Sequence, residues 1–101
     1  MYIYNITTKV THRIHEEWVQ WMKEKHIPKV MNTGCFTEFR FVRVLEINDS
    51  DGPTYAVQFY AATKPDYEYY IAHFAPSLQN DALKNWGDNF IGFRSLMELV
   101  N

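Results

Sequence analysis

One histidine stands where acid–base chemistry would be expected. His26 lies near the end of the stretch WVQWMKEKHIP (residues 18–28), directly before Ile27 and Pro28. The apolar residues of this stretch have helical spacing. A neutral imidazole at the mouth of a pocket can act as a base or a hydrogen-bond donor near pH 7. A histidine at the end of a helix also interacts favourably with the helix dipole, so a structural role explains the same position. His26 is therefore the best candidate for a catalytic residue, and the catalytic residues are otherwise unknown.

Polar side chains within apolar strand patterns are further candidates. Asparagine is disfavoured in strands and a buried amide needs partners, so Asn5 could hold a ligand oxygen. Arg40 and Arg43 lie three residues apart on one expected strand and should face opposite sides of the sheet, where the inward arginine could bind a carboxylate or pair with a glutamate. The pattern leaves open which of the two faces the pocket. We expect Asn5, Arg43 and Tyr60 to contribute to a ligand-binding site.

The tryptophans, the remaining histidines and the cysteine suggest less chemistry. Trp21 lies on an apolar helical stripe and is expected in the core, but a buried indole N–H needs a partner, so Trp21 could also edge a polar cavity. The spacing of His12, His15 and Glu16 matches neither zincin motif, and no metal is predicted. Cys35 has no evident base beside it. Neither a phosphate-binding loop nor a dinucleotide fingerprint is present, so no cofactor is predicted.

The elements that must position these side chains follow from periodicity and turn residues. Thr11 is a plausible N-cap of a first helix, which Pro28 should end or kink near Ile27. Thr63 should cap a second helix, Pro76 should break it, and Gly87 should end the segment that follows. Strands are predicted over residues 2–10, 36–47, 54–62 and 93–100, with turn formers at 48–53.

The order β-α-β-β-α-β predicts one α+β, ferredoxin-like domain over residues 1–101. Right-handed crossovers give this order a four-stranded antiparallel sheet with its helices on one face. The strands carry apolar residues on both sides. In residues 2–10, for example, Tyr2, Tyr4 and Ile6 should point to one face of the sheet and Ile3 to the other. A second copy of the chain is the simplest cover for the free sheet face, so we expect a homodimer through that face.

Composition restricts the partners and the compartment. The chain has 101 residues, 47% of them hydrophobic, and a net charge of -2, which argues against a nucleic-acid partner. The RNA-binding module of the same element order carries RNP1 glycines that FRFVRV lacks. A single cysteine suits the cytoplasm. We expect neither a signal peptide in MYIYNITTKV nor a membrane span, since no apolar run approaches about 20 residues.

Four stretches together resemble a bacterial family described as a domain of unknown function: MYIYNITTKV, HEEWVQWMKEKHIPKVMNTGCF, TYAVQFYA and FRSLMELV. More distantly the pattern is similar to the dimeric α/β-barrel superfamily, which includes antibiotic-biosynthesis monooxygenases, heme-degrading enzymes and stress-responsive barrel proteins. His26-Ile27-Pro28 resembles a His-x-Pro at the end of the first helix in several of these groups. Asn5 resembles in placement an asparagine on the first strand of some of the enzymes, but their later tryptophan and histidine have no match here.

The resemblance implies two protomers packed sheet against sheet, each with a pocket between its helices and its sheet. The leading hypothesis is a cytoplasmic protein that binds a small organic molecule there, with Asn5, Trp21, His26, Arg43 and Tyr60 as ligand-binding residues. One alternative is a cofactor-independent or heme-linked monooxygenase or isomerase of the barrel type. Another is a purely structural dimer whose pocket is filled by side chains.

Overall fold

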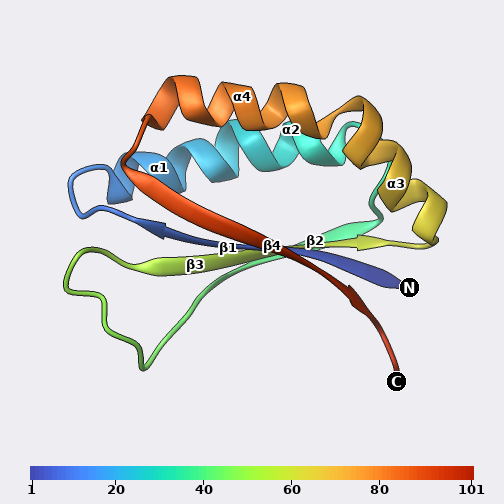
Figure 1. Cartoon of the computed structure of the whole chain (residues 1–101), viewed down its shortest axis with the longest axis horizontal. Helices are drawn as coiled ribbons and strands as arrows, with labels where there is room; N and C mark the ends of the chain where they lie inside the picture. Colours follow the sequence, from blue (N-terminus) through green and yellow to red (C-terminus); the bar gives the residue numbers. More distant parts are fainter.

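The computed structural model describes residues 1–101 and consists of one layer of helices on one face of an antiparallel sheet (Figure 1). The four strands pair in the order β2-β3-β1-β4. This is the ferredoxin-like arrangement that the element order predicts. The strands are β1 (Tyr2–Val10), β2 (Glu38–Arg43), β3 (Thr54–Ala61) and β4 (Phe90–Glu98). The predicted hairpin of β2 and β3 is confirmed, although β2 ends at Arg43 and β4 begins three residues earlier than expected.

The first helical segment is a continuous rod made of α1 (His15–Trp21), a π-helical turn η1 (Met22–His26) and α2 (Ile27–Met31). Pro28 was expected to end or kink this helix near Ile27, and instead the helix continues to Met31. The π turn explains this, because the Ile27 N–H bonds the carbonyl of Met22, five residues back. Pro28 then occupies the first turn of α2, where its missing N–H costs little.

The prediction of Thr11 as an N-cap is wrong. The helix begins at His15 after a turn, and Ile14 stands at the cap position without a side-chain hydrogen bond. The hydroxyl of Thr11 instead donates to the side-chain oxygen of Asn89, at a distance of 3.2 Å. This contact ties the start of the first crossover to the start of β4.

The other helices are α3 (Lys64–His73) and α4 (Ala75–Trp86). The cap predicted at Thr63 is confirmed, since its hydroxyl accepts the Asp66 N–H at 3.3 Å. Pro76 lies in the first turn of α4, which begins directly after α3. Gly87 ends α4 with φ +58°, a backbone conformation that glycine adopts without a steric penalty.

Strand pairing sorts the side chains onto the two faces of the sheet. Directly opposed residues share a face, so Tyr4 and Phe59 point toward the helices together. Asn5 is opposed by Gln58 on one side and by Ser95 on the other, and these point to the uncovered face. The core lies between sheet and helices and is strongly aromatic, with Phe36 at its centre, 4.9 Å from the Tyr70 ring and 5.3 Å from the Phe59 ring between centroids.

Candidate functional site

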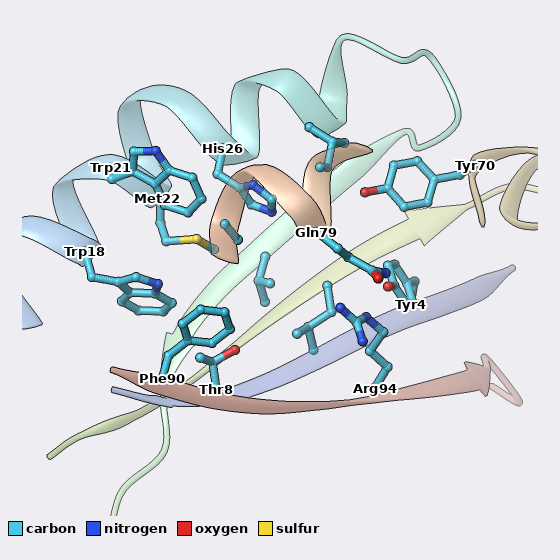
Figure 2. Close-up of a pocket in the computed structure, with 14 residues that line it drawn as sticks. Tyr4, Thr8, Trp18, Trp21, Met22, His26, Tyr70, Gln79, Phe90 and Arg94 are labelled. Carbon is cyan, nitrogen blue, oxygen red and sulfur yellow. The ribbon is translucent and has the colours of Figure 1, made fainter. Parts of the chain in front are cut away.

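A cavity of about 90 Å³ lies between the helix layer and the sheet (Figure 2). Its helix side is formed by the first helical rod, α4 and Tyr70 of α3, and its sheet side mostly by β1 and β4. Ten of the fourteen lining residues are hydrophobic, and the polar groups are few. Concave, mostly apolar sites with a few placed polar groups are typical of small-molecule binding sites.

His26 and Trp21 lie together on the helix side of this cavity. Trp21 is the last residue of α1 and His26 is the last residue of the π turn, so the two are five residues apart. This spacing matches the i to i+5 turn, and the rings stack with centroids 4.9 Å apart and an interplanar angle of 23°. The ring of Trp86 on α4 packs edge-on against Trp21, with centroids 5.8 Å apart.

The imidazole of His26 has a buried polar atom without a partner. No hydrogen bond is formed by Nδ1, and its surface is closed to solvent. Most buried polar atoms in proteins are paired, and an unpaired one costs about 1–3 kcal/mol. His26 borders the cavity as a residue, but this nitrogen itself is closed to the open space.

The charge state of His26 follows from its surroundings. Burial lowers the pKa of His26 from 6.5 to about 4; Asp81 opposes this shift and Lys29 adds to it. The imidazole is therefore neutral at pH 7. A general base works best when its pKa lies near the working pH, so this imidazole suits hydrogen bonding to a ligand better than proton abstraction.

The opposite end of the cavity carries three polar side chains from three elements. Tyr4 comes from β1, Gln79 from α4 and Arg94 from β4, and their polar ends approach one another in Figure 2. Burial raises the pKa of Tyr4, while the charge and hydrogen bonding of Arg94, and hydrogen bonding from Gln79, act in the other direction. Burial also raises the pKa of Tyr70, so both phenols are protonated donors at neutral pH.

The predicted site residues do not all meet in this cavity. Trp21 and His26 line it together. Asn5 and Tyr60 point to the uncovered face of the sheet, as the strand register requires, and are therefore separated from the cavity by the sheet itself. Asn5 is satisfied locally, because its amide donates to the Thr7 hydroxyl at 3.1 Å.

The two arginines of β2 point to opposite faces, as predicted. Arg43 opposes Tyr55 and lies on the helix side, whereas Arg40 opposes Gln58 on the uncovered face. Arg43 nevertheless lies outside the cavity, because β2 is an edge strand and its guanidinium pairs with Asp49 of the following loop at 3.1 Å. The expectation that Arg43 belongs to the pocket is therefore not met by the geometry.

Sequence reasoning missed the polar end of the cavity. Arg94 lies within the expected last strand, residues 93–100, but the sequence does not show which face of the sheet it occupies. The register Ile6–Arg94 puts both residues on the helix side. For Gln79, helical spacing was an available signal, because it precedes Ala82 on the apolar stripe of α4 by three residues. Tyr4 was assigned to the face of Ile6, but its role as a cavity wall required knowing which face the helices cover.

Some other kinds of site find little support. No three His, Cys, Asp or Glu side chains lie close enough to bind a metal ion together. None of the helices has the length and apolar character needed to cross a bilayer. A volume of about 90 Å³ is far below the roughly 300–1,000 Å³ of sites that enclose drug-sized ligands. A porphyrin is too large for this cavity, so the cavity does not support the heme-linked alternative.

Several solved structures of other proteins have the same fold. A dimeric ferredoxin-like protein from an uncultured marine organism has a TM-score of 0.66 at 13% identity, with 99% of this chain and 96% of that chain covered. The cofactor-independent oxygenase SnoaB from Streptomyces nogalater has a TM-score of 0.67 at 11% identity, with 99% and 94% covered. An antibiotic biosynthesis monooxygenase has a TM-score of 0.69 at 10% identity, with both chains fully covered. At these identities the likeness establishes the ferredoxin-like fold.

The sequence itself gives the family. Residues 1–100 match the model of the domain of unknown function DUF4286, and the chain belongs to this family. The predicted resemblance to a domain-of-unknown-function family is thereby confirmed. Comparison with curated protein sequences returns no significant match.

Proposed function

We propose that this protein binds a small organic molecule in the cavity between its helices and its sheet. The observation that carries the proposal is the mostly apolar cavity itself, which has only a few polar side chains and lies between the helices and the sheet. A structural dimer with a filled pocket would not leave this space open, since an unfilled cavity lowers the free energy of unfolding. A ligand with an apolar body would fill this space, and its polar group would face the few polar side chains of the lining.

Filling the cavity tests this proposal. Ala82 lines the cavity on α4, and Ala82→Leu places three additional carbon atoms there, whereas Ala72→Leu adds the same atoms on an exposed position of α3. Small organic compounds are screened by NMR, with the amide signals of cavity residues as the readout. Compounds that shift these signals in the wild type and in Ala72→Leu, but not in Ala82→Leu, support the proposal. Binding that persists unchanged in Ala82→Leu, or no binding to the cavity, contradicts it.

The functional unit in this proposal is a homodimer joined through the uncovered faces of two sheets, with residues 1–101 of each chain acting as one domain. Several large apolar side chains lie on that face, including Ile91 and Phe93, which are 69% and 66% exposed in the protomer. Large exposed apolar patches mark interaction sites. Dimeric ferredoxin-like proteins of the same fold support this assembly. Gel filtration with light scattering should give twice the 12.0 kDa chain mass.

The location in this proposal is the bacterial cytoplasm. Cys35 is the chain's one cysteine, is free and is buried in the core. Proteins of a reducing compartment rarely contain disulfides, and a chain with one free cysteine agrees with such a compartment. Fractionation of cells that express the full chain tests the location.

Catalysis without a cofactor is a second candidate, favoured by the stacked pair of Trp21 and His26 in the cavity wall. SnoaB, of the same fold, is described as a cofactor-independent oxygenase. Oxygen consumption in the presence of each cavity ligand, compared between the wild type and His26→Gln, separates turnover from binding alone. Loss of consumption in His26→Gln with binding retained would support catalysis, and absence of consumption in the wild type would leave binding as the function.

A further inference from the structure

The cavity has two chemically different ends. Figure 2 shows Trp18, Met22 and Phe90 at one end, where the Thr8 hydroxyl also lies, so this end is mostly apolar. The other end contains Tyr4, Gln79 and Arg94. A molecule that fills this space must therefore be amphipathic, with a polar group at one end and an apolar body at the other.

Arg94 is the one permanently charged residue of the cavity lining, and no acidic residue lies beside it there. The two ion pairs of the structure are formed elsewhere, between Lys29 and Asp81 and between Arg43 and Asp49. The guanidinium of Arg94 thus lacks a carboxylate partner within the protein. Guanidinium groups match carboxylates with two parallel hydrogen bonds, and such charge-assisted bonds are about twice as strong as neutral ones.

The position of Arg94 also avoids the usual penalty for burying a charge. Arg94 lies on the edge strand β4 and is exposed to solvent. The polar end of the cavity, to which Arg94 belongs, therefore opens toward solvent. An anionic group held there would keep part of its hydration while its apolar body entered the cavity. The phenol of Tyr4 remains protonated at neutral pH, because burial raises its pKa, and can donate to an anion.

From this arrangement we infer that the ligand of the cavity is a small monocarboxylate with a short apolar body. The carboxylate binds Arg94 at the rim, with the side chains of Tyr4 and Gln79 as further donors, and the body packs against the apolar end. This inference rests on the proposed small-molecule function and specifies its ligand class. The cavity volume of about 90 Å³ restricts the body to a short chain.

Three five-carbon compounds with head groups of different charge test the inference: pentanoate, pentanamide and pentylamine. Their dissociation constants are measured by NMR titration, followed at the amide signals of Gln79 and Phe90. We expect pentanoate to bind about tenfold more tightly than pentanamide, as hydrogen bonds to a charged group allow, and pentylamine to bind most weakly. The preference for pentanoate should decrease as salt concentration rises, because its charged end lies at the solvent-exposed rim.

Substitution of the arginine assigns the preference to its charge. Arg94→Gln should reduce the difference between pentanoate and pentanamide to less than about twofold, while pentanamide binds as in the wild type. Arg94→Lys keeps the charge and should retain an intermediate preference, which also covers the case in which Arg94→Gln fails to fold. Arg13→Gln is the matched control, since Arg13 is exposed and lies outside the cavity.

The outcomes separate this inference from the proposed function. If pentanamide binds the cavity as tightly as pentanoate, or if the preference for pentanoate survives in both Arg94 variants, the carboxylate inference is overturned and small-molecule binding stands. If none of the three compounds shifts the cavity signals at its solubility limit, the carboxylate inference fails, and the compound screen with Ala82→Leu and Ala72→Leu decides the proposed function separately.

Discussion

Acidification should destabilise the folded protein through one residue, His26. Burial between the helices and the sheet lowers the pKa of His26 from 6.5 to about 4. In the unfolded chain the imidazole returns to water and to its ordinary pKa. As the pH falls, the unfolded state therefore takes up a proton before the folded state does, and the equilibrium moves toward unfolding.

The sign and size of this effect follow from the two pKa values. Above about pH 6.5 the imidazole is neutral in both states, and folding carries no penalty from its titration. The free energy of unfolding then decreases as the pH falls through 6.5 toward 4, and levels off below the folded pKa. Since one pKa unit corresponds to about 1.4 kcal/mol, the loss between pH 7 and pH 4 is about 3 kcal/mol.

Urea unfolding at a series of pH values measures this loss. His26→Gln removes the buried imidazole, and His73→Gln makes the same substitution at an exposed position of α3. The three proteins have the same carboxylates, so the contributions of these groups to the pH dependence of unfolding cancel in the comparison. The wild type and His73→Gln should lose about 3 kcal/mol more than His26→Gln between pH 7 and pH 4. Parallel curves for all three proteins would refute the reasoning.

Three further predictions concern packing, backbone and assembly. Trp18→Ala should lower the free energy of unfolding by about 3–5 kcal/mol, measured in urea, because this indole is only 3% exposed; a loss below about 1 kcal/mol would contradict its core position. Gly52→Ala should not fold stably, as measured by circular dichroism, since its Cβ would lie 1.7 Å from a carbonyl oxygen of β1. In Gly34→Ala the Cβ meets no atom within 4 Å, and the free energy of unfolding should fall by about 1 kcal/mol. Equal effects of the two would argue against this turn geometry. Phe93→Glu on the uncovered sheet face should give a monomer by native mass spectrometry, whereas Leu83→Glu on exposed α4 should remain dimeric; a dimeric Phe93→Glu would exclude this interface.

The sequence was sufficient to predict the fold because local signals agree with the tertiary arrangement. The alternating residue pattern of positions 2–10 predicts the two faces of β1. Thr63 caps the start of α3, and Gly87 ends α4, as their residue types predict. The π turn could not be predicted, since it has no compositional signal and depends on how the rod packs against the sheet. The expected helix end at Pro28 failed for that reason.

The site was predicted less completely because it depends on strand register. Trp21 and His26 were candidates by residue type and position on the first helix, and the π turn between them stacks their rings. Asn5 and Tyr60 looked suitable by residue type, but only the covered face of the sheet decides which strand residues reach the cavity. Arg94 became recognisable as a cavity residue once the pairing of β1 with β4 was fixed.

A crystal structure of the protein grown with pentanoate tests the central claim most directly. If the account is correct, the compound lies inside the helix–sheet cavity, with its carboxylate toward Arg94 and its body between His26 and the apolar end formed by Trp18 and Phe90. An unchanged cavity that remains empty of pentanoate at saturating concentration, or pentanoate bound only elsewhere on the surface, would contradict the claim that this cavity is the binding site.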